Sequence, residues 1–124
     1  MLENNKTILT YNLSEDEGLV IRKVFETLNL FEIKEIEKSM ANMQISDIVS
    51  GLKIETLDSY LPEVKIVLFN NLTDEEINSA VLAVRNNLKE KPILAVVTPT
   101  SENWTFKFLV EHLIEENKWT EIRK

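Results

Sequence analysis

The sequence predicts a single α/β domain with a four-stranded, mainly parallel sheet built from two tandem βαβα repeats, with helices on both faces. The first observation is composition: 124 residues, 44% hydrophobic and 28% charged, suffice to enclose a packed core. The second is that short β-prone runs alternate with helical patterns, which is typical of strands joined by crossovers. The third is that this order occurs twice. We expect one domain over 1–124, with repeat one at about 7–52, a linker at 53–62 and repeat two at about 64–118.

Each repeat opens with the same pattern. Residues 7–11 and 65–69 are β-prone runs, and each is followed by a helical pattern of apolar residues. Ser14 and Thr73 precede these helices, and a glutamate follows each of them three positions later. This spacing predicts a capping box, in which the hydroxyl and the glutamate each accept a bond from a backbone N–H at the helix start.

The second part of each repeat also corresponds. Second strands are expected at 31–36 and 93–97, and last helices over 42–52 and 103–113, with corresponding positions 59 to 61 residues apart. Two parallel units in tandem predict the strand order 2-1-3-4. The same topology predicts a crevice at the carboxyl ends of the first and third strands.

Composition narrows the functional classes. The chain has no cysteine, so disulfides and thiolate metal sites are excluded, and the cytoplasm is the expected location. A net charge of −7 with dispersed basic residues argues against nucleic acid as a partner. No apolar stretch is long enough to cross a bilayer, so no membrane association is expected.

The sequence contains no motif typical of a catalytic, metal-binding or nucleotide-binding site. His112 has no second histidine or cysteine with which to share a metal, and Gly18 and Gly51 match no phosphate-binding loop. We therefore predict no catalytic residue, no metal and no cofactor. A hydrolase or transferase working through carboxylates such as Glu75 or Glu102 is a third interpretation, but acids at helix starts already have a structural role.

The segment from Thr98 to Trp104 follows the most apolar strand and leads into the last helix. Thr98, Thr100, Ser101 and Trp104 can form a site for a small polar or anionic ligand, with hydroxyl donors and an aromatic wall. In the structural interpretation, Thr100 or Ser101 is only the helix N-cap and Trp104 packs on the core.

The two second strands differ in charge. Residues 31–36 include Glu32, Lys34 and Glu35, which protect a sheet edge against pairing, whereas residues 93–97 carry no charge. We expect a second subunit, or the C-terminal tail around Trp119 and Ile122, to cover this unguarded strand. The leading prediction is a non-enzymatic interaction or regulatory module that forms homo-oligomers or binds a protein partner. The alternative is a ligand-binding protein using the Thr98–Trp104 loop.

The second half contains a run of residues that resembles a known family, the bacterial domain of unknown function 3783 (DUF3783). The resemblance covers roughly residues 64–118 and rests on Phe69 to Glu76, Arg85, Leu94 to Thr100, Trp104 and Leu109. It implies no activity, substrate or catalytic residue, because the family has none assigned. If the shared residues mark a site, the resemblance points to Thr98, Pro99, Thr100 and Trp104, with Arg85 as a partner for an anion.

Overall fold

The computed structural model describes residues 6–30, 32–52 and 61–123, with side chains described as far as residue 116. A four-stranded sheet forms the middle layer, with strands in the order β2-β1-β3-β4. The strands are β1 (Thr7–Tyr11), β2 (Ile33–Ile36), β3 (Ile66–Asn70) and β4 (Ile93–Val96). The predicted strand order is therefore confirmed. The expected linker lies largely outside the described residues, since 53–60 are not among them.

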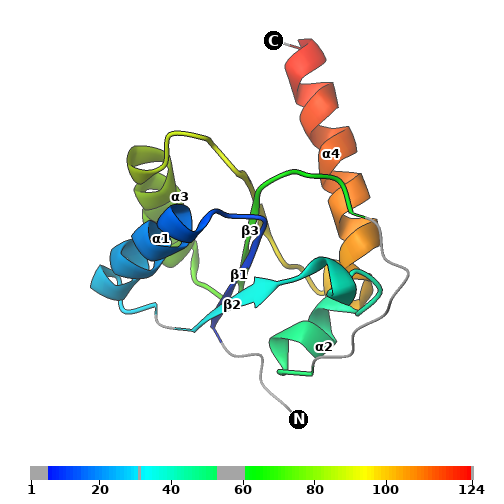
Figure 1. The fold of residues 1–124 in the computed structure, drawn as a ribbon, viewed down its shortest axis with the longest axis horizontal. Helices are drawn as coiled ribbons and strands as arrows, with labels where there is room; N and C mark the ends of the chain where they lie inside the picture. The colour runs from blue at the N-terminus through cyan, green and yellow to red at the C-terminus, as the bar shows by residue number, and fades with distance from the viewer. Residues whose placement is uncertain (1–5, 31, 53–60, 124) are drawn as a thin grey trace.

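Helices cover both faces of the sheet, as predicted. Helices α1 and α3 lie on one face, and α2 and α4 lie on the other (Figure 1). Their bounds are α1 (Glu15–Thr27), α2 (Ile45–Val49), α3 (Asp74–Asn87) and α4 (Phe106–Arg123), with short 3₁₀ turns η1 (Lys38–Met40) and η2 (Ser101–Asn103). The result is a three-layer α/β/α arrangement.

The directions of the strands correct the prediction of a mainly parallel sheet. Strand β1 is parallel to β2, and β3 is parallel to β4, but the central pair β1–β3 is antiparallel, with Tyr11 opposite Ile66. The sheet is therefore mixed. The carboxyl ends of β1 and β3 lie at opposite ends of the sheet, so the crevice predicted between them does not form.

The sequence pattern could not distinguish the two directions, because β1 and β3 are buried at every position, and the short helix α2 fits the antiparallel one. Helix α2 has five residues, and at about 1.5 Å per residue it spans about 7 Å, whereas a five-residue strand spans about 16 Å. A helix this short does not carry the chain back along the strands. The prediction assumed a full crossover helix here, which would have placed the start of β3 level with the start of β1.

Helix α2 ends where it does because of Gly51. Its backbone has a φ of 98°, which favours glycine. The Gly51 N–H donates to the Ile48 carbonyl at 3.1 Å, and the Leu52 N–H donates to the Asp47 carbonyl at 3.0 Å. These two bonds close a helix with glycine just past its end.

Both predicted capping boxes are confirmed. The Glu17 N–H donates to the Ser14 hydroxyl at 3.1 Å, and the Ser14 N–H donates to the Glu17 carboxylate at 2.8 Å. Thr73 and Glu76 make the same two bonds at the same distances. The residues that begin α1 and α3 therefore satisfy backbone N–H groups that have no partner inside the helix.

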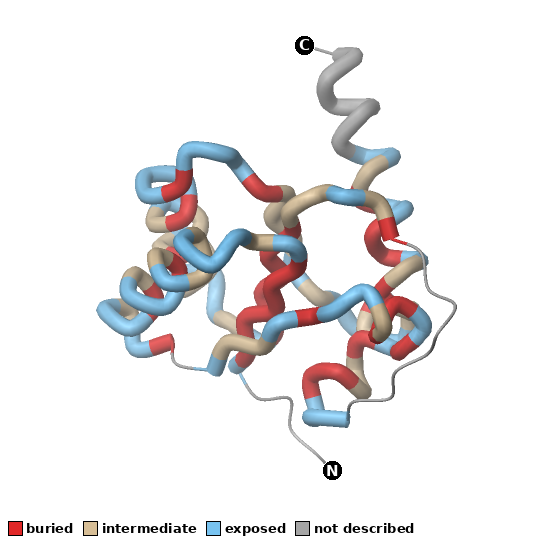
Figure 2. Tube along the Cα trace, viewed as in Figure 1, coloured by how far each residue is buried: buried red, intermediate tan, exposed pale blue. Residues whose placement is uncertain are grey.

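The core is divided between the two faces of the sheet. All residues of β1 and β3 are buried, and their side chains alternate between the layers (Figure 2). On the α1/α3 face Phe25 packs edge-on against Phe69, with ring centroids 6.4 Å apart. On the α2/α4 face Tyr11 packs in the same manner against Phe106, at 5.3 Å. The central strand pair thus lies between two apolar clusters.

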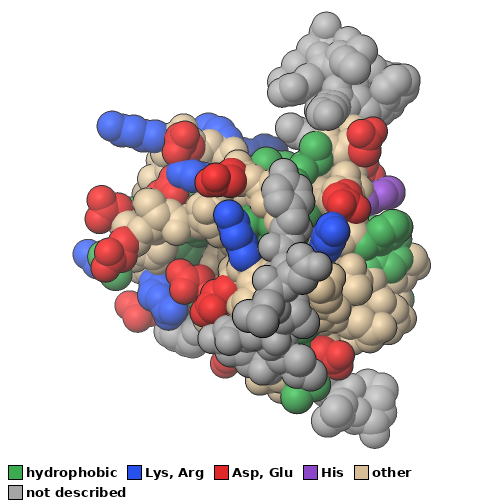
Figure 3. All heavy atoms as spheres, turned by 45° about the vertical axis from the view of Figure 1, so that its right-hand side comes forward, with side chains coloured by type: hydrophobic (Ala, Val, Ile, Leu, Met, Phe, Trp, Pro, Cys, Tyr) green, Lys and Arg blue, Asp and Glu red, His purple; other side chains and the backbone are tan. Residues whose placement is uncertain are grey.

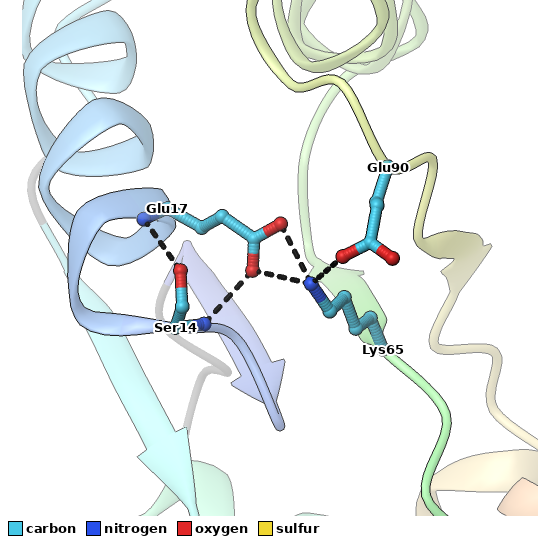
Figure 4. Close-up of polar contacts among 4 residues, drawn as sticks. All are labelled: Ser14, Glu17, Lys65 and Glu90. Carbon is cyan, nitrogen blue, oxygen red and sulfur yellow. Dashed lines mark hydrogen bonds and ion pairs between the residues drawn. The ribbon is translucent and has the colours of Figure 1, made fainter.

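The two halves of the chain contact each other reciprocally. Leu9 lies opposite Leu68 at the middle of the β1–β3 pair. Lys65, just before β3, donates to both carboxylate oxygens of Glu17 at 2.8 Å and also pairs with Glu90 (Figure 4). Lys6, just before β1, pairs with Glu76 at 2.8 Å. Each half therefore supplies a lysine to the capping glutamate of the other.

A second pair of reciprocal contacts lies on the α2/α4 face. The Ile45 N–H donates to the Trp104 carbonyl at 2.9 Å, and the Phe106 N–H donates to the Met43 carbonyl at 2.8 Å. The residues between them, Gln44 and Thr105, form an isolated antiparallel bridge. The starts of α2 and α4 are thereby held together by equivalent backbone bonds.

Candidate functional site

Strand β4 is an edge of the described sheet, because β3 is its sole neighbour there. The Ile93 N–H donates to the Lys65 carbonyl at 2.8 Å, and the Val97 N–H donates to the Phe69 carbonyl at 2.9 Å. Backbone groups alternate in direction along a parallel strand, so those of Leu94 and Val96 point away from β3. The expectation that this uncharged strand forms an edge is confirmed.

The opposite edge, β2, is different in character. It carries Lys34 and Glu35 within four residues, and Glu35 is exposed at a position whose backbone points away from β1. On β4 the corresponding outward position is Val96, whose side chain is apolar and 43% exposed. Charged side chains discourage pairing at a sheet edge, and β4 lacks them.

A pocket of about 460 Å³ lies between β4 and α4. Apolar residues of the two elements form most of its wall. The other lining residues that bear on its chemistry are Thr98, Ser101, Trp104, His112 and Glu116. Among the residues whose side chains are described, the pocket lining includes one carboxylate, that of Glu116, and no lysine or arginine.

The hydroxyls of the predicted loop are largely engaged with one another. The Thr98 hydroxyl donates to the Ser101 hydroxyl at 3.2 Å, and it accepts from the Ser101 N–H at 3.0 Å. The Ser101 hydroxyl also accepts from the Thr98 N–H at 2.9 Å, and Ser101 is buried. These bonds hold the turn η2 against the end of β4.

The expected N-cap of the last helix is wrong by several residues. Helix α4 begins at Phe106, and the Phe108 N–H donates to the Thr105 hydroxyl at 3.2 Å, as in an N-cap. Ser101 instead lies in η2, and Thr100 makes no side-chain capping bond. The residue type was predicted correctly, but three hydroxyl residues precede Thr105 in this loop and the sequence does not distinguish them.

Trp104 belongs to an aromatic cluster that sequence reasoning missed. Its ring meets the rings of Phe108 and His112 edge-on, with centroids 4.8 Å and 5.1 Å away, and the His112 Nε2 lies 3.5 Å from a Glu116 carboxylate oxygen. Figure 3 shows the single histidine beside exposed hydrophobic surface. The spacing of four between 104, 108, 112 and 116 is the signal that could have revealed it.

The structure brings together some of the predicted site residues. Thr98, Ser101 and Trp104 line one pocket, whereas Thr100 is exposed and does not line it. Arg85 lies on α3, across the sheet from α4, and is exposed. It therefore does not contribute a cation to this pocket. The side chains of Trp119 and Ile122, expected to cover β4, lie outside the described residues.

The described residues contain no group of three histidine, cysteine, aspartate or glutamate side chains placed to hold a metal ion. No helix among them is both long enough and apolar enough to cross a membrane.

The geometry defines a three-layer α/β domain with an uncharged edge strand and an adjoining pocket. A family model described as a domain of unknown function, DUF3783, matches residues 65–120. The predicted resemblance is therefore confirmed from β3 into α4, which includes the edge strand and the pocket. The match covers less than half of the chain. Neither the comparison with curated proteins nor that with solved structures gives a match.

Proposed function

We propose that the protein is a non-enzymatic interaction module that self-associates through β4. The observation that carries this proposal is an edge strand that bears no charge and directs the backbone groups of Leu94 and Val96 away from its own sheet. A second strand satisfies such groups by extending the sheet. Val96 adds exposed apolar surface that a partner would bury.

A second copy of the chain fits this edge by symmetry. Two β4 strands that pair antiparallel about a two-fold axis at Ala95 place Leu94 of each copy opposite Val96 of the other. Both residues direct their N–H and C=O outward, so the pair exchanges backbone hydrogen bonds in both directions. No charged side chain is brought opposite another along residues 93–97.

The internal arrangement of the chain supports the same mode of pairing. We propose that residues 7–52 and 65–113 are repeats of one βαβα unit, on the basis of their matched capping boxes and their reciprocal lysine–glutamate pairs. These two units already meet through an antiparallel strand pair centred on Leu9 and Leu68. Association through β4 would repeat that relation between chains.

Sedimentation velocity on matched proline variants tests the proposal. Val96→Pro removes an outward N–H, and Glu35→Pro removes the equivalent N–H from β2, so neither change breaks a hydrogen bond within the sheet. The wild-type chain should dimerise with a Kd of roughly tens to hundreds of micromolar, as expected for a small contact. Val96→Pro should be monomeric, and Glu35→Pro should dimerise normally.

Two results would contradict the proposal, provided that circular dichroism shows both variants to be folded. One is a wild-type chain that remains monomeric up to about 1 mM, a concentration at which even weak specific contacts are populated. The other is equal dimerisation of the two proline variants.

The second candidate function is binding of a small ligand in the pocket beside Trp104. The observation that favours it is the pocket volume of about 460 Å³, which falls in the range of small-molecule sites. A metabolite screen by thermal shift should give a hit that Trp104→Ala abolishes in a chain that is still folded. A hit that is indifferent to this substitution would exclude the site.

A further inference from the structure

The aromatic cluster of Trp104, Phe108 and His112 lies next to the edge strand β4. Its rings meet edge-on, and Phe108 and His112 are exposed while Trp104 is half-buried (Figure 3). Trp104 lines the same pocket as Ala95 and Val96, so the cluster adjoins the strand. Exposed apolar surface that gathers in one place is typical of an interaction site.

The polar side chains around the cluster have partners within the chain. The His112 Nε2 lies 3.5 Å from a Glu116 carboxylate oxygen, and the hydroxyls of Thr98 and Ser101 bond to each other at 3.2 Å. A polar ligand would have to displace these contacts, whereas an apolar surface can cover the rings and leave the contacts in place. The cluster therefore favours an apolar partner.

Pairing of β4 alone is a small contact. The strand has four residues and spans about 13 Å, whereas each partner in a typical specific complex buries about 800 Å² of surface. A specific dimer through β4 would therefore need further apolar surface beside the strand. In the described part of the chain, the aromatic cluster provides such surface, because Trp104 forms a wall of the adjoining pocket and Phe108 is 50% exposed.

The symmetry of the proposed strand pair determines which surface of a second copy lies near the cluster. A two-fold axis between antiparallel strands stands perpendicular to the sheet, so both copies keep α4 on the same face. Ala95 lies at the axis and directs its side chain toward that face. The two α4 helices therefore run in opposite directions on either side of the axis, and the pocket side of each, with Trp104, faces the other copy.

The opposite sheet edge is more closed. Lys34 on β2 corresponds to Ala95 on β4, because they pair with Leu9 and Leu68, which face each other at the centre of the sheet. The Lys34 ammonium donates to the Val49 carbonyl at 2.9 Å, so this side chain bridges β2 and α2. Ala95 is too short to bridge β4 and α4, and the pocket there is about 460 Å³ against about 190 Å³ beside β2. The edge that is open to a second copy is therefore β4.

We propose that the aromatic cluster is a second part of the self-association surface, and that the aromatic cluster of a second copy of the chain covers it. This inference rests on the proposed strand pairing and adds to it a surface on α4. The paired β4 strands set the register of the two copies through their hydrogen bonds. The rings of Trp104 and Phe108 supply the apolar area at the centre of the contact.

Two alanine variants test the role of the cluster by sedimentation velocity. Phe108→Ala removes a side chain that is 50% exposed on α4, and Leu82→Ala removes one that is 60% exposed on α3, across the sheet. Phe108→Ala should raise the Kd of the dimer at least about tenfold, because a few large aromatic residues carry most of the energy of an interface. Leu82→Ala should leave the Kd within about twofold of the wild-type value. Circular dichroism should show both variants to be folded, because neither side chain is part of the core.

Isotope-filtered NOE spectra locate the contact itself. Labelled and unlabelled chains are mixed at a total concentration of about 1 mM, at which weak specific contacts are populated. NOEs between copies should join the ring of Trp104 or Phe108 in one copy to side chains of α4 in the other. The same spectra should join the Hα atoms of Ala95 in the two copies, because these atoms face each other across the axis of an antiparallel pair.

The outcomes separate this inference from the strand pairing beneath it. If the Ala95 contact is present and no ring contact joins the copies, the inference is wrong and the strand pairing stands. A loss of affinity in Phe108→Ala no greater than that in Leu82→Ala leads to the same conclusion, provided that Val96→Pro is monomeric. Ring contacts without the Ala95 contact would overturn the inference together with the strand pairing, as would a wild-type chain that stays monomeric.

Discussion

At the residue scale, short-range capping bonds and long-range ion pairs meet at the same two glutamates, Glu17 and Glu76. The capping bonds that these glutamates make with Ser14 and Thr73 span three residues, so they are encoded locally in the sequence. The ion pair between Lys6 and Glu76 joins residues 70 apart, and its counterpart between Lys65 and Glu17 joins residues 48 apart. Such pairs depend on which strand end lies beside which helix start, and the pattern of charges along the sequence does not predict this arrangement.

These ion pairs predict a pH dependence of stability. The Lys65 ammonium bonded to Glu17 holds the pKa of that carboxyl below its ordinary value of 4.5, and Lys6 does the same for Glu76. A carboxyl with a lowered folded-state pKa stabilises the fold above the unfolded pKa, and the effect is lost as pH falls through the folded value. The unfolding free energy should therefore fall from about pH 5 downward.

Lys65→Met should reduce this acid dependence, which urea unfolding at several pH values between 7 and 3 would measure. The dependence should not vanish, because the Ser14 N–H also lowers the pKa of Glu17. Lys23→Met, at an exposed position on α1, provides the matched control. Equal acid dependence in the two variants would show that Lys65 does not control the titration of Glu17.

At the element scale, strands and capped helices were predicted closely, and the last helix of each half was not. Residues 42–52 and 103–113 have the same apolar spacing, yet the first gives a helix of five residues and the second begins one of 18. Gly51 accounts for the early end of α2, because its backbone adopts a left-handed conformation just past that helix, whereas residues 106–123 contain no glycine. Gly51 was therefore the residue from which the early end of α2 could have been predicted.

Two phenylalanines on the same helix turn should differ sharply in their effect on stability. Phe106 is fully buried against Tyr11, whereas Phe108 is 50% exposed beside Trp104. Phe106→Ala should lower the unfolding free energy by about 3–5 kcal/mol, and Phe108→Ala by less than about 1 kcal/mol. Chemical denaturation would measure both, and similar losses would show that α4 is packed differently.

At the scale of the whole molecule, the direction of the central strands could not be obtained from the sequence. Strands β1 and β3 are buried at every position, so their apolar pattern would be the same with parallel or antiparallel neighbours. The candidate site, too, could be predicted only in part from the sequence. The loop residues Thr98, Ser101 and Trp104 were identifiable because they are contiguous, but His112 and Glu116 join them only after α4 packs on the sheet.

The net charge of −7 predicts how self-association should respond to salt. Two acidic chains repel each other, while the proposed contact along β4 contains no ion pair that salt would weaken. Dimerisation should therefore strengthen when NaCl is raised from about 20 mM to about 500 mM, as sedimentation would show. Weakening with salt would mean that charged surfaces, and not β4, form the contact.

Amide hydrogen exchange in β4 tests the central claim most directly. In dilute solution the N–H groups of Leu94 and Val96 should exchange rapidly, while those of Ala95 and Val97, which point toward β3, should be protected. At high protein concentration Leu94 and Val96 should gain protection, and the outward amide of Glu35 on β2 should not. If Leu94 and Val96 exchange equally fast at both concentrations, β4 does not pair with a second chain.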